Sequence, residues 1–159
     1  MKNLLVALII FLSSLSLVAE DNTKPATQGI DHLGLTVSDL SATTSFFIDV
    51  LGWRLAGRDK SYPANFVTDG QSFVTLWQVK DKSKLVTFNR KYNVGLHHLA
   101  IKVSSFETLD VLYNRMKNRS DVVIEFAPEL FYGGPAKHMM IREPSGNRLE
   151  FIHRPPKAN

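Results

Sequence analysis

The stretches His32-Leu-Gly-Leu-Thr-Val37 and His98-Leu-Ala-Ile-Lys-Val103 share one pattern and lie in different halves of the chain. In each stretch a histidine is followed by apolar residues at alternate positions, which predicts a β-strand with one apolar face. The histidine shares the opposite face with a small residue and a polar residue, and we expect that face to line a cavity. The repeated pattern indicates a chain built from two copies of one structural unit.

The elements that follow the first of these strands are predicted by their caps and turns. A helix is expected to begin at Ser38 or Asp39 and to end before Gly52, because these residue types suit the two ends of a helix. Asp69-Gly70 is typical of a hairpin turn. The strands of this first copy are expected at residues 30–37, 53–58, 65–68 and 72–79.

The second copy repeats this plan after a bridge at residues 81–95. Residues 104–107 have a capping-box pattern that predicts the start of a helix, and residues 128–135 are expected to form a loop. The strands are expected at residues 96–103, 122–126, 137–142 and 148–153. The sequence therefore predicts an α+β fold of two tandem βαβββ modules, the first at about residues 29–80 and the second at about residues 96–155.

The composition places the chain among ordinary globular proteins. It has 159 residues, of which 44% are hydrophobic and 21% are charged, so one domain can bury a substantial core. The formal net charge of +4 comes from scattered basic residues without a recognisable nucleic-acid module, so we expect no nucleic-acid partner. Because the chain contains no cysteine, any metal site must use histidine and carboxylate ligands.

The N-terminus has the pattern of a secretory signal peptide at residues 1–19. Lys2 precedes an apolar run, and Ala19 stands where cleavage is expected. The apolar run is too short to span a membrane, and Leu17 departs from the preferred cleavage pattern, so an uncleaved N-terminal anchor is the alternative. We expect a periplasmic or extracellular protein with no stable membrane span, a tether at residues 20–28 and a single domain at residues 29–155.

Four segments together resemble the vicinal oxygen chelate superfamily, which includes glyoxalase I, bleomycin-resistance proteins, fosfomycin-resistance enzymes and extradiol dioxygenases. They are the strand at residues 31–37, the helix at residues 39–53, the strand at residues 96–103 and the ending Glu143-Pro-Ser-Gly-Asn-Arg-Leu-Glu-Phe151. The resemblance implies a cup-shaped mixed sheet around one divalent metal ion.

Three residues match the metal ligands of that superfamily. They are His32 in the first strand, His98 at the start of the second module and Glu150 in the last strand. The fourth position of glyoxalase I falls nearest to Thr75, in a strand without Asp, Glu or His, which argues against a true glyoxalase I. Two histidines and one carboxylate suit Fe(II), Mn(II), Ni(II) or Zn(II), and the ligands do not distinguish these ions.

Further residues are candidates for the remaining parts of a site. His138 is a candidate general acid or base, and a packed polar residue is its alternative. Phe73, Thr75 and Trp77 alternate on one strand and are candidates for a substrate-binding wall, although core packing produces the same pattern. Tyr132 is expected in a loop at the rim, or in a plain turn.

Two functions are compatible with these residues. The first is a metal-dependent enzyme of lyase, transferase or dioxygenase type, in which the metal chelates an oxygen-bearing small molecule. The alternative is a non-catalytic protein that sequesters a ligand, as bleomycin-resistance proteins do. We expect a homodimer, and the cup can form within one chain or by exchange of modules between two chains.

Overall fold

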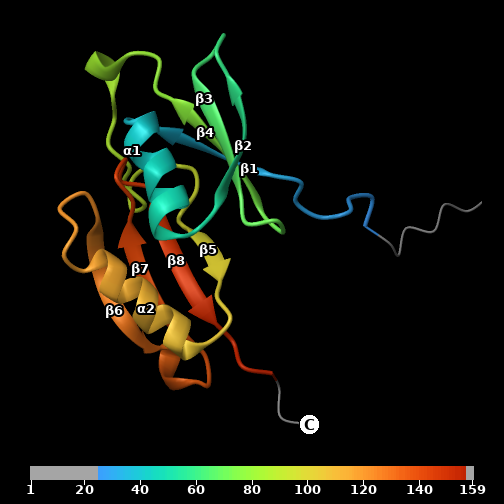
Figure 1. Cartoon of the computed structure of the whole chain (residues 1–159), viewed down its shortest axis with the longest axis vertical. Helices are drawn as coiled ribbons and strands as arrows, with labels where there is room; N and C mark the ends of the chain where they lie inside the picture. The colour runs from blue at the N-terminus through green and yellow to red at the C-terminus, as the bar shows by residue number, and fades with distance from the viewer. Residues whose placement is uncertain (1–24, 157–159) are drawn as a thin grey trace, which may run out of the picture.

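The computed structural model describes residues 25–156, which form an upper and a lower half in Figure 1. The predicted signal peptide and most of the tether lie outside the described residues. The first half contains β1 (Leu33–Val37), α1 (Leu40–Ser45), the π-helical turn η1 (Phe46–Val50), β2 (Arg54–Asp59), β3 (Ala64–Thr68) and β4 (Phe73–Gln78). The second half, reached through η2 (Lys82–Lys84), contains β5 (Leu99–Lys102), α2 (Phe106–Met116), β6 (Val123–Leu130), η3 (Phe131–Gly133), β7 (Lys137–Arg142) and β8 (Arg148–His153).

The two halves have the same sheet topology. The strand orders are β1-β4-β3-β2 and β5-β8-β7-β6, and in each sheet the first strand is parallel to the last while the other pairs are antiparallel. In each half the helix follows the first strand and packs on its own sheet. The prediction of an α+β fold with two βαβββ modules is therefore confirmed.

The local signals that delimit the helices act as predicted in the first module. The side chain of Asp39 caps α1 by accepting a hydrogen bond from Ala42 N at 2.9 Å. The helix then widens into η1, where Leu51 N donates to Phe46 O at 3.3 Å. Gly52, with φ of +77°, ends the segment, because a glycine adopts this conformation without a Cβ clash.

The first strand of each module is shorter than predicted. Pairing begins with Leu33 against Val74 in the first sheet and with Leu99 against Leu149 in the second. His32 and His98 therefore stand immediately before their strands, in equivalent positions of the two modules. They lie where the sheet no longer constrains the direction of each side chain.

The strand β6 is longer than predicted and includes Pro128, which was expected in a loop. Its pairing with β7 is interrupted between Ile124 and Phe126 and between Phe126 and Glu129. Because β6 is an edge strand of its sheet and is bulged here, a proline without an N–H can be accommodated. The loop before β7 is thus reduced to η3 and its neighbours.

One apolar core joins the two modules. It contains side chains from both sheets and both helices, among them Phe46, Phe47, Leu109, Met116 and Phe151, which are all at most 1% exposed. Arg115 of α2 also donates to Val50 O in η1 at 3.0 Å. Each sheet thus buries one face against its helix and leaves the other face free of helices. Within residues 25–156 no helix has the length and apolar character needed to cross a membrane.

Candidate functional site

The helix-free face of the second sheet gathers polar side chains. Leu149 and Phe151 of β8 point into the core, so Glu150 between them points to the opposite face. Glu150 is paired with Ala100 of β5 and Met140 of β7, and cross-strand neighbours share a face. This strand alternation and register place the predicted carboxylate ligand on the helix-free face.

His98 and Glu150 are brought together by the fold. Nε2 of His98 lies 3.2 Å from Oε2 of Glu150. The Glu150 side chain is 7% exposed, whereas the His98 side chain is 32% exposed. Two of the three predicted metal ligands therefore meet, with the carboxylate buried and the imidazole facing outward.

His138 contacts the other oxygen of the same carboxylate. Its Nδ1 lies 2.5 Å from Oε1 of Glu150, and because an ionised carboxylate only accepts, Nδ1–H is the donor. The ring packs against Phe126 and Phe131, with centroid distances of 4.9 and 4.8 Å. The ring of His138 is therefore fixed and holds Glu150 in one orientation.

His97 is the neighbour of His98 and also reaches it through its side chain. The two Nδ1 atoms are 2.9 Å apart, so one donates and the other accepts. Desolvation lowers the pKa of His97, and the positive charge of Arg148 lowers it further. Both residues precede β5, so the alternation of a strand does not separate their rings.

His32 does not join this group. It stands before β1, where its Nδ1 lies 2.6 Å from Oδ1 of Asp31, and its side chain is 53% exposed. It lines a cavity of about 620 Å³ together with Phe73, Ala100 and Lys102. Among the residues that the structure describes, no three His, Asp or Glu side chains are arranged to hold a metal ion.

The helix-free face of the first sheet is aromatic. Phe73, Thr75 and Trp77 alternate on β4, and Trp77 Nε1 donates to Thr75 Oγ1 at 2.9 Å. The Trp77 ring packs against Tyr62 and Phe66 at centroid distances of 5.3 and 5.9 Å. The three predicted wall residues thus share one apolar surface, although Thr75 is only 6% exposed.

Tyr132 lies in η3, beside the residues that pack on His138. It is 94% exposed and has a φ of +50°, a backbone conformation that side-chain-bearing residues rarely adopt. Its ring lies edge-on to Phe131 at 4.7 Å. Since Phe131 contacts His138, the predicted rim residue is one side chain away from the candidate site.

Comparison with known proteins identifies the family of this fold. A family model for the glyoxalase/bleomycin resistance protein/dioxygenase superfamily matches residues 29–151. The chain belongs to this superfamily. No curated protein sequence matches the chain.

Solved structures of the superfamily share the fold at low sequence identity. A glyoxylase/bleomycin resistance protein/dioxygenase domain from Frankia sp. EAN1pec has a TM-score of 0.71 at 20% identity, covering 84% of this chain and 96% of its own. A fosfomycin resistance protein from Listeria monocytogenes has a TM-score of 0.63 at 18% identity, and the match covers 81% of this chain and 95% of that protein. A lactoylglutathione lyase from Agrobacterium tumefaciens has a TM-score of 0.60 at 20% identity, and the match covers 81% of this chain and 96% of that protein. These likenesses establish the fold.

The contact of His98 with Glu150 is compatible with the divalent metal that the superfamily implies. Two ligands at about 2.1 Å from one ion are about 3.0 Å apart when they subtend a right angle. The observed 3.2 Å between Nε2 of His98 and Oε2 of Glu150 fits this arrangement. The 2.5 Å contact of His138 is a hydrogen bond that orients the carboxylate, as residues behind metal ligands commonly do.

A second polar group on the same sheet was missed by sequence reasoning. Glu125 of β6 accepts from Arg142 Nε at 2.8 Å and from Arg148 Nε at 2.6 Å, and Nη1 of Arg90 lies 3.5 Å away. Desolvation alone would raise the pKa of Glu125, but the hydrogen bonds from Arg148 and Arg142 lower it. The four residues are widely spaced in the sequence, so only the strand register reveals them.

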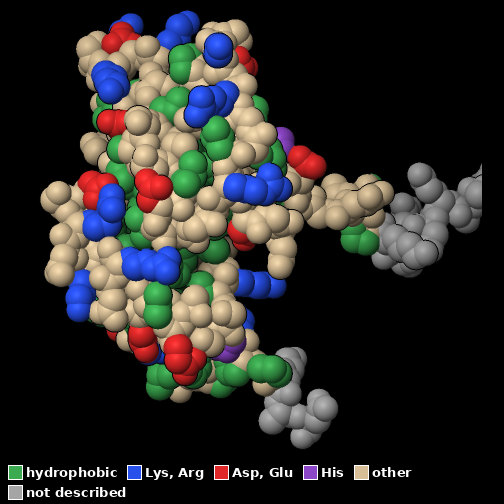
Figure 2. Space-filling view, viewed as in Figure 1, with side chains coloured by type: hydrophobic (Ala, Val, Ile, Leu, Met, Phe, Trp, Pro, Cys, Tyr) green, Lys and Arg blue, Asp and Glu red, His purple; other side chains and the backbone are tan. Residues whose placement is uncertain are grey.

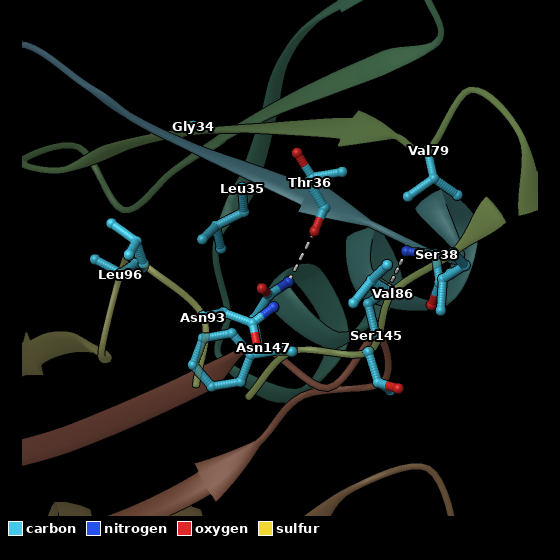
Figure 3. A pocket seen from close by; sticks show the side chains of 15 residues that line it. Gly34, Leu35, Thr36, Ser38, Val79, Val86, Asn93, Leu96, Ser145 and Asn147 are labelled. Carbon is cyan, nitrogen blue, oxygen red and sulfur yellow. Dashed lines mark hydrogen bonds between the residues drawn. The ribbon is translucent and has the colours of Figure 1, made fainter. Parts of the chain in front are cut away.

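The bridge between the modules lines a further cavity of about 440 Å³, shown in Figure 3. Asn147 Nδ2 donates to Thr36 O at 3.1 Å across it, and Ser38 N donates to Ser145 Oγ at 3.0 Å. Val86 of the bridge and Leu96, directly after it, form its apolar side. The bridge contains none of the residues predicted for the site, and none of the candidate metal ligands lines this cavity.

Proposed function

We propose that the protein is a metal-dependent small-molecule enzyme of lyase, transferase or dioxygenase type. His98 and Glu150 would hold one divalent cation together with a third ligand, His32. The distance of 3.2 Å between Nε2 of His98 and Oε2 of Glu150 carries the proposal. A bound divalent cation would bind and polarise an oxygen atom of the substrate.

The chain's own residues would divide the remaining tasks. Glu150 would compensate part of the cation's charge, and His138 keeps the carboxylate in one orientation through its Nδ1–H. The aromatic side chains of Tyr62, Phe66 and Trp77 offer an apolar surface that excludes water from one side of a ligand.

The third ligand is proposed to come from a second copy of the chain. His32 is half-exposed and is held by Asp31, with no contact to His98 or Glu150 in its own chain. A homodimer that exchanges modules would bring the His32 of one copy to the His98 and Glu150 of the other. In such a dimer the aromatic face of one module would also meet the polar face of the other.

The metal content of variants tests this site. His98→Ala is expected to lose the ion, because its Nε2 is one of two ligands that already converge, and His32→Ala is expected to weaken binding. His153→Gln is the matched control, since Nδ1 of His153 contacts Val103 O away from Glu150. Elemental analysis after dialysis measures the ion, and equal metal content in all three variants would refute the proposed site.

The second candidate function is sequestration of a small molecule without a metal. It is supported by the position of His32, which leaves the single chain with an incomplete ligand set, and by the aromatic face of the first sheet. Metal titration separates the two functions. An absence of binding of Fe(II), Mn(II), Ni(II) or Zn(II), together with tight binding of an aromatic ligand, would favour sequestration.

We also propose that the protein is exported, on the strength of the signal pattern at residues 1–19. Mass spectrometry of the mature protein is expected to detect an N-terminus close to Glu20 in a periplasmic or secreted fraction. A full-length chain held at the membrane would instead support the uncleaved anchor.

A further inference from the structure

Glu125 stands at the centre of three arginines on the helix-free side of the second sheet. Arg142 and Arg148 each donate through Nε to a different oxygen of Glu125, at 2.8 and 2.6 Å. Nη1 of Arg90, from the bridge between the modules, lies 3.5 Å from Glu125 Oε1. The Glu125 side chain is 13% exposed, so this group is largely withdrawn from solvent.

The charges of this arginine cluster do not balance. Three guanidinium groups face one carboxylate, which leaves an excess of positive charge. The Arg142 side chain is 38% exposed and the Arg90 side chain is 27% exposed, so both side chains remain partly accessible to solvent. The Nε atoms of Arg142 and Arg148 are engaged by Glu125, while each guanidinium has further N–H groups in a planar fork that suits an oxyanion.

A purely structural role would need fewer cations. One arginine neutralises a partly buried carboxylate, and each further cation near it adds repulsion between like charges. Figure 2 shows Lys and Arg side chains spread over the visible face and mixed with acidic ones, as is usual for a solvated surface. The arginine cluster differs because its members come from three separate segments and converge on one point.

The cluster lies next to the candidate metal ligands. Arg148 and Glu150 are separated by one residue on β8 and share a face, so their Cα atoms are about 7 Å apart. Nη1 of Arg148 is 3.5 Å from Nδ1 of His97, whose ring contacts His98. A small ligand with one end at His98 and Glu150 would therefore reach the arginines with its other end.

We propose that Arg90, Arg142 and Arg148 form an oxyanion subsite beside the His98–Glu150 pair. The ligand would carry a carboxylate, phosphonate or phosphate group at one end and, at the other, the oxygen atom that is held at His98 and Glu150. This inference rests on the proposed small-molecule function, since it names the chemical class of its ligand. The arginines would bind and orient that group without taking part in the reaction.

Titration with methylphosphonate tests the subsite on metal-free protein. The probe carries only the anionic end of the ligand, and ³¹P NMR follows its binding. Wild-type protein is expected to give a saturable shift, and Arg142→Met and Arg90→Met are expected to weaken binding by about tenfold, as loss of a charge-assisted hydrogen bond does. Acetate as a competitor distinguishes a general oxyanion site from one that prefers tetrahedral phosphonates.

Arg119→Met is the matched control variant. Arg119 is 36% exposed and is also paired with a carboxylate, Asp121, but it lies outside the cluster, so binding should be unchanged. The neutral ester dimethyl methylphosphonate should not bind. The inference is overturned if wild-type protein gives no saturable shift, if the neutral ester binds equally, or if both cluster variants bind like Arg119→Met.

The outcome is separable from that of the proposed metal site. His98→Ala is expected to bind methylphosphonate like the wild type while it loses the metal ion. Wild-type protein that takes up the metal ion but does not bind methylphosphonate would reject the subsite alone. Intact methylphosphonate binding in a protein that takes up no metal would reject the metal site and leave the subsite in place.

Discussion

Thr43 in the first module donates a hydrogen bond from Oγ1 to Oε2 of Glu143 in the second module, at 2.7 Å and across 100 residues of sequence. Thr43 is fully buried and Glu143 is 2% exposed. The Glu143 carboxylate also accepts from Ser145 N and Asn147 N, both at 2.9 Å. A buried carboxylate with several donors fixes geometry strongly, so this contact sets how the modules dock.

Thr43→Val removes this donor while keeping the shape of the side chain. We expect the free energy of unfolding to fall by about 1–3 kcal/mol, because a buried charged acceptor loses one of its partners. Urea denaturation measures the change. Thr87→Val, at an exposed position of the bridge, is the control, and an equal effect of the two substitutions would contradict the role of the contact.

The stability contributed by Glu125 should depend on pH. Its pKa in the folded protein lies below the ordinary value of 4.5, since the arginine hydrogen bonds outweigh desolvation. The charged carboxylate therefore stabilises the fold above pH 4.5, and this contribution is lost as the pH falls through the folded-state pKa. Glu125→Gln should cost about 1–3 kcal/mol at neutral pH, with a shrinking difference in acid.

Urea denaturation of wild type and Glu125→Gln over a series of pH values measures this difference. Glu129→Gln serves as the control, because the Glu129 side chain is 60% exposed. A difference between wild type and Glu125→Gln that stays constant from neutral to acidic pH would show that charge is not the cause.

The contact of His138 with Glu150 should tune metal affinity. His138→Phe removes the Nδ1–H donor, and we expect metal binding to weaken by about 10- to 100-fold, as it does when the partner of a ligand is lost. His138→Asn can place an amide N–H near the same oxygen and should restore part of the affinity. Metal titration gives the dissociation constants, and equal affinity of His138→Phe and wild type would exclude this positioning role.

If two chains exchange modules, two variants with impaired metal binding should complement each other. A heterodimer of His32→Ala and His98→Ala has one site with both substitutions and one intact site. Mixed and refolded together, the two variants should regain one full-affinity metal site per heterodimer, whereas His98→Ala alone should bind no ion and His32→Ala alone should bind it only weakly. In a cup built within one chain every site carries one substitution, so a mixture that binds metal no better than His32→Ala alone would point to the single-chain arrangement.

Sequence patterns determined the modular plan of this protein. Alternating apolar residues predicted the strands, and local hydrogen bonding explains why Asp39 was recognised as a helix cap and Asp69-Gly70 as a turn: Asp69 Oδ1 accepts from Gln71 N at 2.9 Å. The alternation of Leu149 and Phe151 with Glu150 also accounts for the position of Glu150 on the face opposite the core. These features depend on residues close together in the chain, so a single sequence contains the information.

Only the tertiary structure decided which polar side chains meet. The register of β7 against β8 pairs Met140 with Glu150 and so brings His138 within hydrogen-bond distance of that carboxylate. The same register places Arg142 opposite Arg148, and the irregular pairing of β6 with β7 accommodates Pro128 in a bulged edge strand. Both arginines then meet Glu125 of β6. Register and module docking depend on hydrogen bonds between distant segments, which the local pattern of residues does not encode. For the same reason, the local pattern of residues predicted one site from His32, His98 and Glu150. The fold of one chain brings only His98 and Glu150 together.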